Sequence, residues 1–278
     1  NVAELIKKML RHVDYKPDFI PYFYGATSGN AFFIREMMRY LMEEQLIYRE
    51  KAQWIIPDSY TEWQLPTSIG DTIQHRLKRL SPEAVALIEM IAVVGKRIEL
   101  PLLEHLCGSE SDNLFSLLEE LIERQFLLRE GDVFLFPHDR VRETLYSSLE
   151  DSRKRPVHQK IGQWLEERGE AVSVLAYHFK NGQDKVKASR YLIEAGEAAP
   201  VRMEATLLMH EGIALLEKLF GLPEQAELLE KHRRKLAWVS YMIQPFICAE
   251  TCEKLIESLQ DREVPLENQI EFESILIS

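Results

Sequence analysis

The chain lacks the sequence signatures of the common catalytic centres. Its 278 residues contain neither a G-x-x-x-x-G-K-[ST] phosphate loop nor a G-x-S-x-G nucleophile turn. Gly95-Lys96 is the one Gly-Lys pair, but Met90 stands where the loop needs its first glycine, and Arg97 stands where it needs Ser or Thr. We therefore expect this chain on its own to catalyse no reaction.

Cysteine and long apolar runs are also scarce. The three cysteines suit a reducing compartment, and no further Cys or well-spaced His completes a zinc set around Cys248 and Cys252. The longest apolar run, residues 84–95, contains Glu89 and is too short to span a bilayer. The sequence predicts a cytoplasmic protein that does not enter a membrane.

Basic residues are outnumbered, with 34 Lys and Arg against 45 Asp and Glu and a net charge of −11. Such a surface disfavours unspecific binding to nucleic acid or to an anionic membrane. The composition, 46% hydrophobic and 28% charged, is that of a folded protein with two or three domains. Because the chain begins at Asn1 and ends in an apolar-periodic run, we expect it to be a piece of a longer protein.

Residues 1–66 are predicted to form a small helical domain. Residues 2–9 are amphipathic, and Pro17 and Pro21 are expected to break the chain that follows. Residues 27–30 (TSGN) supply capping side chains, and apolar residues then recur at helical spacing to about residue 46. Residues 47–57 are typical of a short hairpin or an extended crossing segment.

Residues 67–150 are predicted to form a winged-helix domain. Helices are expected over 68–80, 82–94, 101–107 and 112–125, with a short strand over 97–99. A β-hairpin around Glu130-Gly131-Asp132 and a helix from Asp139 follow. Some winged helices bind DNA, but the helix that would enter the groove carries four acidic residues against two basic ones, so we expect protein packing and no nucleic-acid partner.

Residues 151–278 are predicted to form a helical-hairpin solenoid of the tetratricopeptide type, truncated at its C-terminus. Paired helices recur with a period near 40 residues. We expect Tyr177, Phe179 and Tyr191 in the solenoid core, and a last helix from residue 266 to the end. The overall fold class is therefore mostly α.

The junction Pro137-His138-Asp139 is the strongest candidate binding feature. It places His138 at the start of a helix, where unpaired N–H groups and the helix dipole favour an anion such as phosphate. The alternative is that His138 merely caps the helix or fills the corner between hairpin and helix.

Several segments together resemble the downstream half of STAND-class signal-transduction ATPases. Residues 27–34 (TSGNAFFI) are similar to the family's T-G-G-N-P-F-F-L, and residues 136–146 (FPHDRVRETLY) to F-R-H-A-L-V-R-E-A-L-Y. Between and after them lie similar blocks at residues 65–69 (LPTSI), 76–84 (RLKRLSPEA) and 175–179 (LAYHF). The resemblance covers residues 1 to about 195, in the family's order.

The resemblance implies a split nucleotide site. A Gly-x-Pro segment of the family abuts adenine and corresponds to Gly29, Asn30 and Ala31, where alanine replaces the proline. The family's winged-helix histidine, which reaches the β-phosphate of ADP, corresponds to His138. For Gly29 and Asn30 an ordinary helix cap is the alternative interpretation.

We thus expect a non-catalytic regulatory and sensor fragment of a STAND-type ATPase. Its partners would be an upstream P-loop ATPase domain of the same chain and a protein or small-molecule effector on the repeats. ATP or ADP would bind the intact protein, which would carry a kinase, cyclase or transcription-regulator output, and neither nucleotide is expected to bind this fragment stably. The alternative is a helical protein-interaction scaffold with no nucleotide role.

Overall fold

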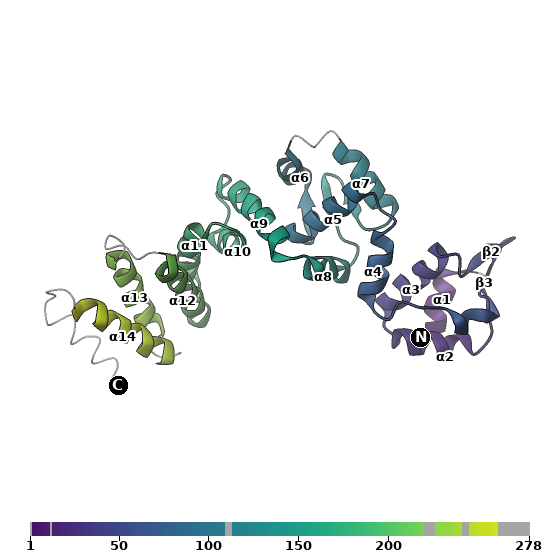
Figure 1. Cartoon of the computed structure of the whole chain (residues 1–278), viewed down its shortest axis with the longest axis horizontal. Helices are drawn as coiled ribbons and strands as arrows, with labels where there is room; N and C mark the ends of the chain where they lie inside the picture. Colours follow the sequence, from purple (N-terminus) through teal and green to yellow (C-terminus); the bar gives the residue numbers. More distant parts are fainter. Residues whose placement is uncertain (1, 12, 109–112, 220–225, 241–244, 261–278) are drawn as a thin grey trace. The chain divides into compact units, whose positions relative to one another are not determined.

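The computed structural model describes residues 2–11, 13–108, 113–219, 226–240 and 245–260. The chain divides into two compact units, one formed by Asn1–Ala92 and Asn113–Ser148, the other by Val93–Asp112 and Leu149–Ser278. Most of the described residues are helical, which confirms the mostly α fold class (Figure 1). The domain boundaries at residues 66 and 150 stay a prediction.

The first unit begins with three helices, α1 (Val2–Met9), α2 (Phe19–Thr27) and α3 (Ala31–Glu43), which pack on one another. Pro17 precedes α2, but the expected break at Pro21 is wrong. Pro21 lies in the first turn of α2, where its missing N–H would have had no helical partner. The buried core includes Ile6, Phe19 and Met37.

The segment after α3 is a hairpin, so the extended crossing alternative is excluded. Strands β2 (Tyr48–Glu50) and β3 (Gln53–Ile55) pair antiparallel, with Arg49 opposite Trp54. The short strand β1 (Val13–Asp14) adds to β3 in parallel. A 3₁₀ turn over Asp58–Glu62 then leads to the next helices.

The remaining elements of the first unit are helices and one hairpin, and the winged helix itself stays a prediction. They are α4 (Ile69–Leu77), α5 (Pro82–Val94, which runs into the second unit), α7 (Leu114–Glu123), the hairpin β5 (Leu128–Glu130) and β6 (Val133–Leu135), and α8 (Asp139–Ser148). Gly131 turns the hairpin with φ of +65°, a conformation that favours glycine. Ser81 caps α5, because its Oγ accepts a hydrogen bond from Ala84 N at 3.2 Å.

The second unit contains β4 (Arg97–Glu99) and α6 (Leu100–Cys107), and then a succession of packed helices. These are α9 (Asp151–Glu166), α10 (Val172–Asn181), α11 (Lys185–Ala198), α12 (Arg202–Leu219), α13 (Ala226–Ser240) and α14 (Pro245–Gln260). Each of these helices packs on the next one along the chain. The first of them, α9, also packs on α6. The predicted helix from residue 266 lies outside the described residues.

Three aromatic residues test the predicted solenoid core. Phe179 and Tyr191 are buried and stack with ring centroids 5.2 Å apart, as expected. The prediction for Tyr177 is wrong, since its side chain is 52% exposed. Tyr177 precedes two buried residues on α10 and lies on the opposite face of that helix.

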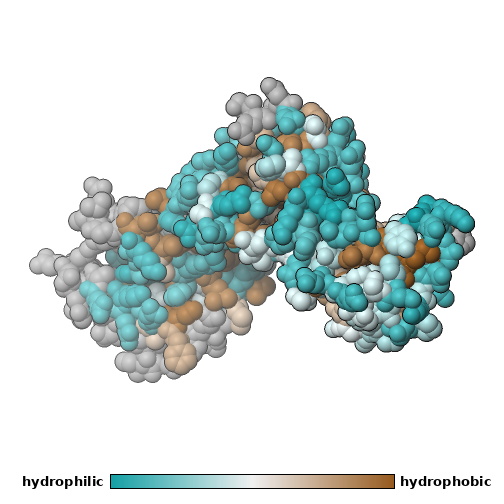
Figure 2. Space-filling model, turned by 45° about the vertical axis from the view of Figure 1, so that its right-hand side comes forward, coloured by the Kyte–Doolittle hydropathy of each residue, from teal (hydrophilic) through white to brown (hydrophobic). Residues whose placement is uncertain are grey.

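On the face shown in Figure 2, hydrophilic side chains cover much of the surface of each unit, and apolar side chains form separate groups. Within the described residues, no helix has both the length and the apolar character needed to cross a membrane.

Candidate functional site

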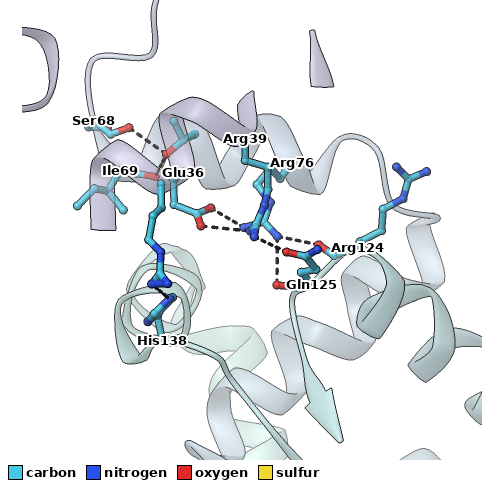
Figure 3. A network of polar contacts seen from close by, with 10 residues as sticks. Glu36, Arg39, Ser68, Ile69, Arg76, Arg124, Gln125 and His138 are labelled. Carbon is cyan, nitrogen blue, oxygen red and sulfur yellow. Dashed lines mark hydrogen bonds and ion pairs between the residues drawn. The ribbon is translucent and has the colours of Figure 1, made fainter. Parts of the chain in front are cut away.

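His138 lies immediately before α8 and faces α3 (Figure 3). Its imidazole Nε2 is 3.2 Å from Nη1 of Arg35. The ring of Phe32 packs on the imidazole edge to face, with centroids 5.1 Å apart. The carbonyl of His138 accepts a hydrogen bond from Val141 N at 3.1 Å, which joins the residue to the first turn of α8.

The Arg35 contact determines where the proton of His138 lies. A guanidinium can only donate, so Nε2 must accept and the proton of the neutral ring lies on Nδ1. Burial lowers the pKa of His138, Arg35 and Arg39 lower it further, and Glu36 and Asp139 act in the opposite direction. His138 is therefore neutral at pH 7.

Gly29, Asn30 and Ala31 form the start of α3, where Asn30 is the N-cap. Its Oδ1 accepts hydrogen bonds from Phe32 N at 3.0 Å and Phe33 N at 3.1 Å, so the capping interpretation is confirmed. Ser28 and Gly29 reach this cap through positive φ angles of 51° and 70°. The positive φ favours glycine at position 29, and a Cβ there would also lie 2.7 Å from Cε2 of the exposed Tyr24, whose ring would have to shift.

Gly29 and Ala31 also line an open cavity of about 740 Å³ in the first unit. Its wall is largely apolar, and the charged side chains at its margin come from α1. The lining residues are Val2, Glu4, Leu5, Lys8, Ile20, Pro21, Tyr24, Gly29, Ala31 and Ile34. Capping α3 and lining a cavity are compatible roles for this segment.

Helix α3 joins the two predicted parts of the site. At the N-terminus of α3, Ala31 lines the cavity and the next residue, Phe32, packs on the ring of His138. Arg35, one turn later, contacts Nε2 of His138. The residues predicted from the sequence are thus brought to one end of one helix.

A buried polar network beside His138 was missed by the sequence reasoning. Glu36 on α3 accepts hydrogen bonds from Arg76 on α4 at 2.5 Å and from Arg39 at 3.3 Å. Arg76 also donates to the carbonyls of Arg124 and Gln125, at 2.8 and 3.3 Å, and Arg39 donates to the Gln125 side chain (Figure 3). One signal was present in the sequence: Glu36 falls on the buried stripe of α3, where an unpaired carboxylate would be costly.

The acidic side of α7 has a packing role. The carboxylate of Glu120 accepts hydrogen bonds from Ser81 N at 2.8 Å and Ser81 Oγ at 2.7 Å. These bonds lower the pKa of Glu120, which therefore stays charged on this helix. A carboxylate held in this way does not suit contact with DNA phosphates. Among the described residues, no group of three or more His, Cys, Asp or Glu side chains could hold a metal ion.

Comparison with known proteins finds a structural match. No family model matches the chain, and no curated protein does. A solved structure that matches is that of a STAND protein (signal transduction ATPase with numerous domains) with a tetratricopeptide repeat sensor, from Pyrococcus horikoshii. The alignment covers 100% of this chain and 40% of that one, at 15% sequence identity and a TM-score of 0.48. The chain therefore spans less than half the length of that protein.

Proposed function

We propose that this chain is the non-catalytic regulatory and sensor part of a cytoplasmic STAND-type signalling ATPase. An upstream domain of the same protein would supply the phosphate loop. His138 would contact the phosphates of ADP and so hold the first unit against that domain. The repeats of the second unit would bind a protein or small-molecule effector.

The observation that carries the proposal is the pairing of His138 with Arg35 at the start of α8. Arg35 can donate to an anion, His138 can do so once Nε2 carries a proton, and the helix N-terminus adds a favourable dipole. Among the described residues, Arg35 forms no ion pair with a carboxylate, so its charge is available to a ligand.

The cavity at the start of α3 supports the nucleotide role. Tyr24, Ile20 and Ile34 give it an apolar wall that suits the flat face of a nucleobase. Ala31 contributes less surface than a proline ring would, and its φ is free. We therefore expect a weaker base contact than a proline would give, and no stable binding of ADP to this chain alone.

The proposed switch requires that ADP bind the closed state of the protein more tightly than the open state. A ligand shifts a conformational equilibrium only as far as its affinity for the two states differs. ADP that contacts both the phosphate loop and His138 would favour the closed state. An effector that binds the repeats would favour exchange for ATP and release of the clamp.

The test is nucleotide retention by the full-length protein that carries this chain. We expect His138→Ala to lower the ADP that copurifies, and to weaken ADP affinity about tenfold, as the loss of one hydrogen bond to a charged group would. His105→Ala is the matched control, because His105 is an exposed helical histidine. Unchanged ADP retention in His138→Ala would reject the clamp and favour the helical scaffold.

A further inference from the structure

Arg35 on α3 and His138, immediately before α8, are two basic side chains that face each other at 3.2 Å. The other two arginines of this region have a carboxylate partner, because Arg39 and Arg76 share Glu36. Arg35 is exposed on α3, and its one described hydrogen bond is to His138. The pair thus has donor capacity that the chain itself does not use.

The charges around His138 favour an anion. Arg35, Glu36 and Arg39 face it from α3, and Asp139 adjoins it on α8. Glu36 is turned toward Arg76, with which it forms a fully buried ion pair. Three arginines, Arg35, Arg39 and Arg76, therefore stand against two carboxylates, which leaves one positive charge in a chain whose net charge is −11.

In the free pair the single imidazole proton lies on Nδ1, so Nε2 has no proton to donate to an anion. While Nε2 of His138 accepts from Arg35, it cannot donate to a ligand. A phosphate oxygen between the two groups would instead accept from both. That requires Arg35 to turn to the oxygen and Nε2 to carry a proton. The negative charge of the phosphate favours a second proton, taken from the solvent, over a shift of the Nδ1 proton to Nε2.

We propose that Arg35 and His138 together bind a phosphate group, which replaces the hydrogen bond between them, and that His138 takes up one proton as the phosphate binds. The assignment of that phosphate to a nucleotide rests on the proposed function. Phosphate capture itself belongs to this chain and can be measured without nucleotide. Phe32 packs edge to face on the imidazole ring in the free chain. In the whole protein, ADP would then be retained more strongly as the pH falls.

The experiment follows the imidazole proton signal of His138 by NMR during pH titrations of the 278-residue chain. One titration contains inorganic phosphate, and the other contains chloride at the same ionic strength. We expect phosphate to raise the pKa of His138 by about 1, as a nearby opposite charge does. Arg35→Gln should abolish most of this rise. Arg140→Gln, which removes an exposed arginine paired with Glu143 on α8, should retain it.

Two results would overturn the proposal: a His138 pKa that phosphate does not change, or an equal rise in the wild type and in Arg35→Gln. Arg35→Lys, which keeps the charge but loses the planar fork, should give a smaller rise than the wild type.

ADP retention by the full-length protein separates the two proposals. If His138→Ala loses ADP while Arg35→Gln keeps it, the nucleotide clamp stands and the shared site is overturned. If phosphate raises the pKa of His138 but His138→Ala retains ADP, the shared phosphate site stands and the nucleotide clamp fails.

Discussion

Glu36 and Arg76 form an ion pair at 2.5 Å in which the side chains are only 3% and 2% exposed. The pair connects α3 with α4, and through the carbonyls of Arg124 and Gln125 it reaches the end of α7. Arg76 also lies over the ring of Phe126, 4.2 Å from its centroid. Charges this deeply buried are tolerated because each is met by several hydrogen bonds. The network thereby fixes α3, which carries Arg35, relative to the elements that lead to His138.

Arg76→Met should therefore lower the free energy of unfolding by about 3–5 kcal/mol, because it leaves Glu36 buried with only Arg39 as a partner. Urea unfolding followed by circular dichroism measures this loss. Arg79→Met is the matched control, since Arg79 forms a partly exposed ion pair with Glu44 that should contribute about 1 kcal/mol or less.

The double variant Glu36→Leu/Arg76→Met should recover part of that loss, because no carboxylate then stays buried without its main partner. A single variant Arg76→Met as stable as Arg79→Met would contradict the structural importance of the pair.

Local chemistry explains what the sequence could predict. Asn30 caps α3, Gly131 turns the hairpin and His138 precedes α8, and each of these depends on residues within a few positions of one another.

Long-range pairing explains what the sequence could not predict. Arg35 is 103 residues from His138, and Glu36 is 40 residues from Arg76, so only the packing of separate helices brings them together. Tyr177 shows that an apolar stretch alone does not predict burial. It is an aromatic residue within such a stretch, yet it lies on the exposed face of α10. Single large apolar side chains are common at the surface of folded proteins.

The cap at Asn30 can be tested apart from any ligand. Asn30→Ala should lower the free energy of unfolding by about 1 kcal/mol, because Phe32 N and Phe33 N lose their acceptor. Asn113→Ala is the control, since Asn113 precedes α7 without a side-chain capping bond and should be nearly neutral. Equal losses in the two variants, measured in urea, would show that the Asn30 cap is not stabilising.

His158 on α9 and His178 on α10 make the second unit sensitive to acid. Their Nδ1 atoms are 3.1 Å apart, so one ring donates to the other and both are neutral. Burial lowers the pKa of each to about 4, and His178 and Lys154 contribute to the shift at His158. In the unfolded chain both pKa values return to about 6.5.

Because the folded pKa values are depressed, the stabilisation is complete above pH 6.5 and is lost as the pH falls toward 4. The loss should be at most about 3 kcal/mol for each histidine. Urea unfolding at pH 7.5 and 4.5 measures it. His178→Gln should show a smaller difference between the two pH values than the wild type, and the exposed His105→Gln an unchanged one. Equal differences in all three proteins would exclude this histidine pair as the source.

Gly212 allows the close approach of α11 and α12. A Cβ at this position would lie 2.8 Å from Cγ1 of Ile193 and 3.0 Å from the carbonyl oxygen of Ser189. That carbonyl belongs to the helical backbone of α11 and cannot move alone. The hydroxyl of Ser189 also donates to the carbonyl of Gly212 at 2.8 Å, so any separation of the helices weakens this bond too.

Gly212→Ala should therefore lower the free energy of unfolding by about 1–3 kcal/mol, the cost of overpacking, although alanine is the better helix former by about 1 kcal/mol. Gly25→Ala in α2 isolates the helix-propensity effect, because a Cβ at Gly25 meets no atom within 4 Å. It should raise the free energy of unfolding by up to about 1 kcal/mol. Thermal and urea unfolding of both variants should give changes of opposite sign. A stabilising Gly212→Ala would mean that α11 and α12 pack less closely than the structure shows.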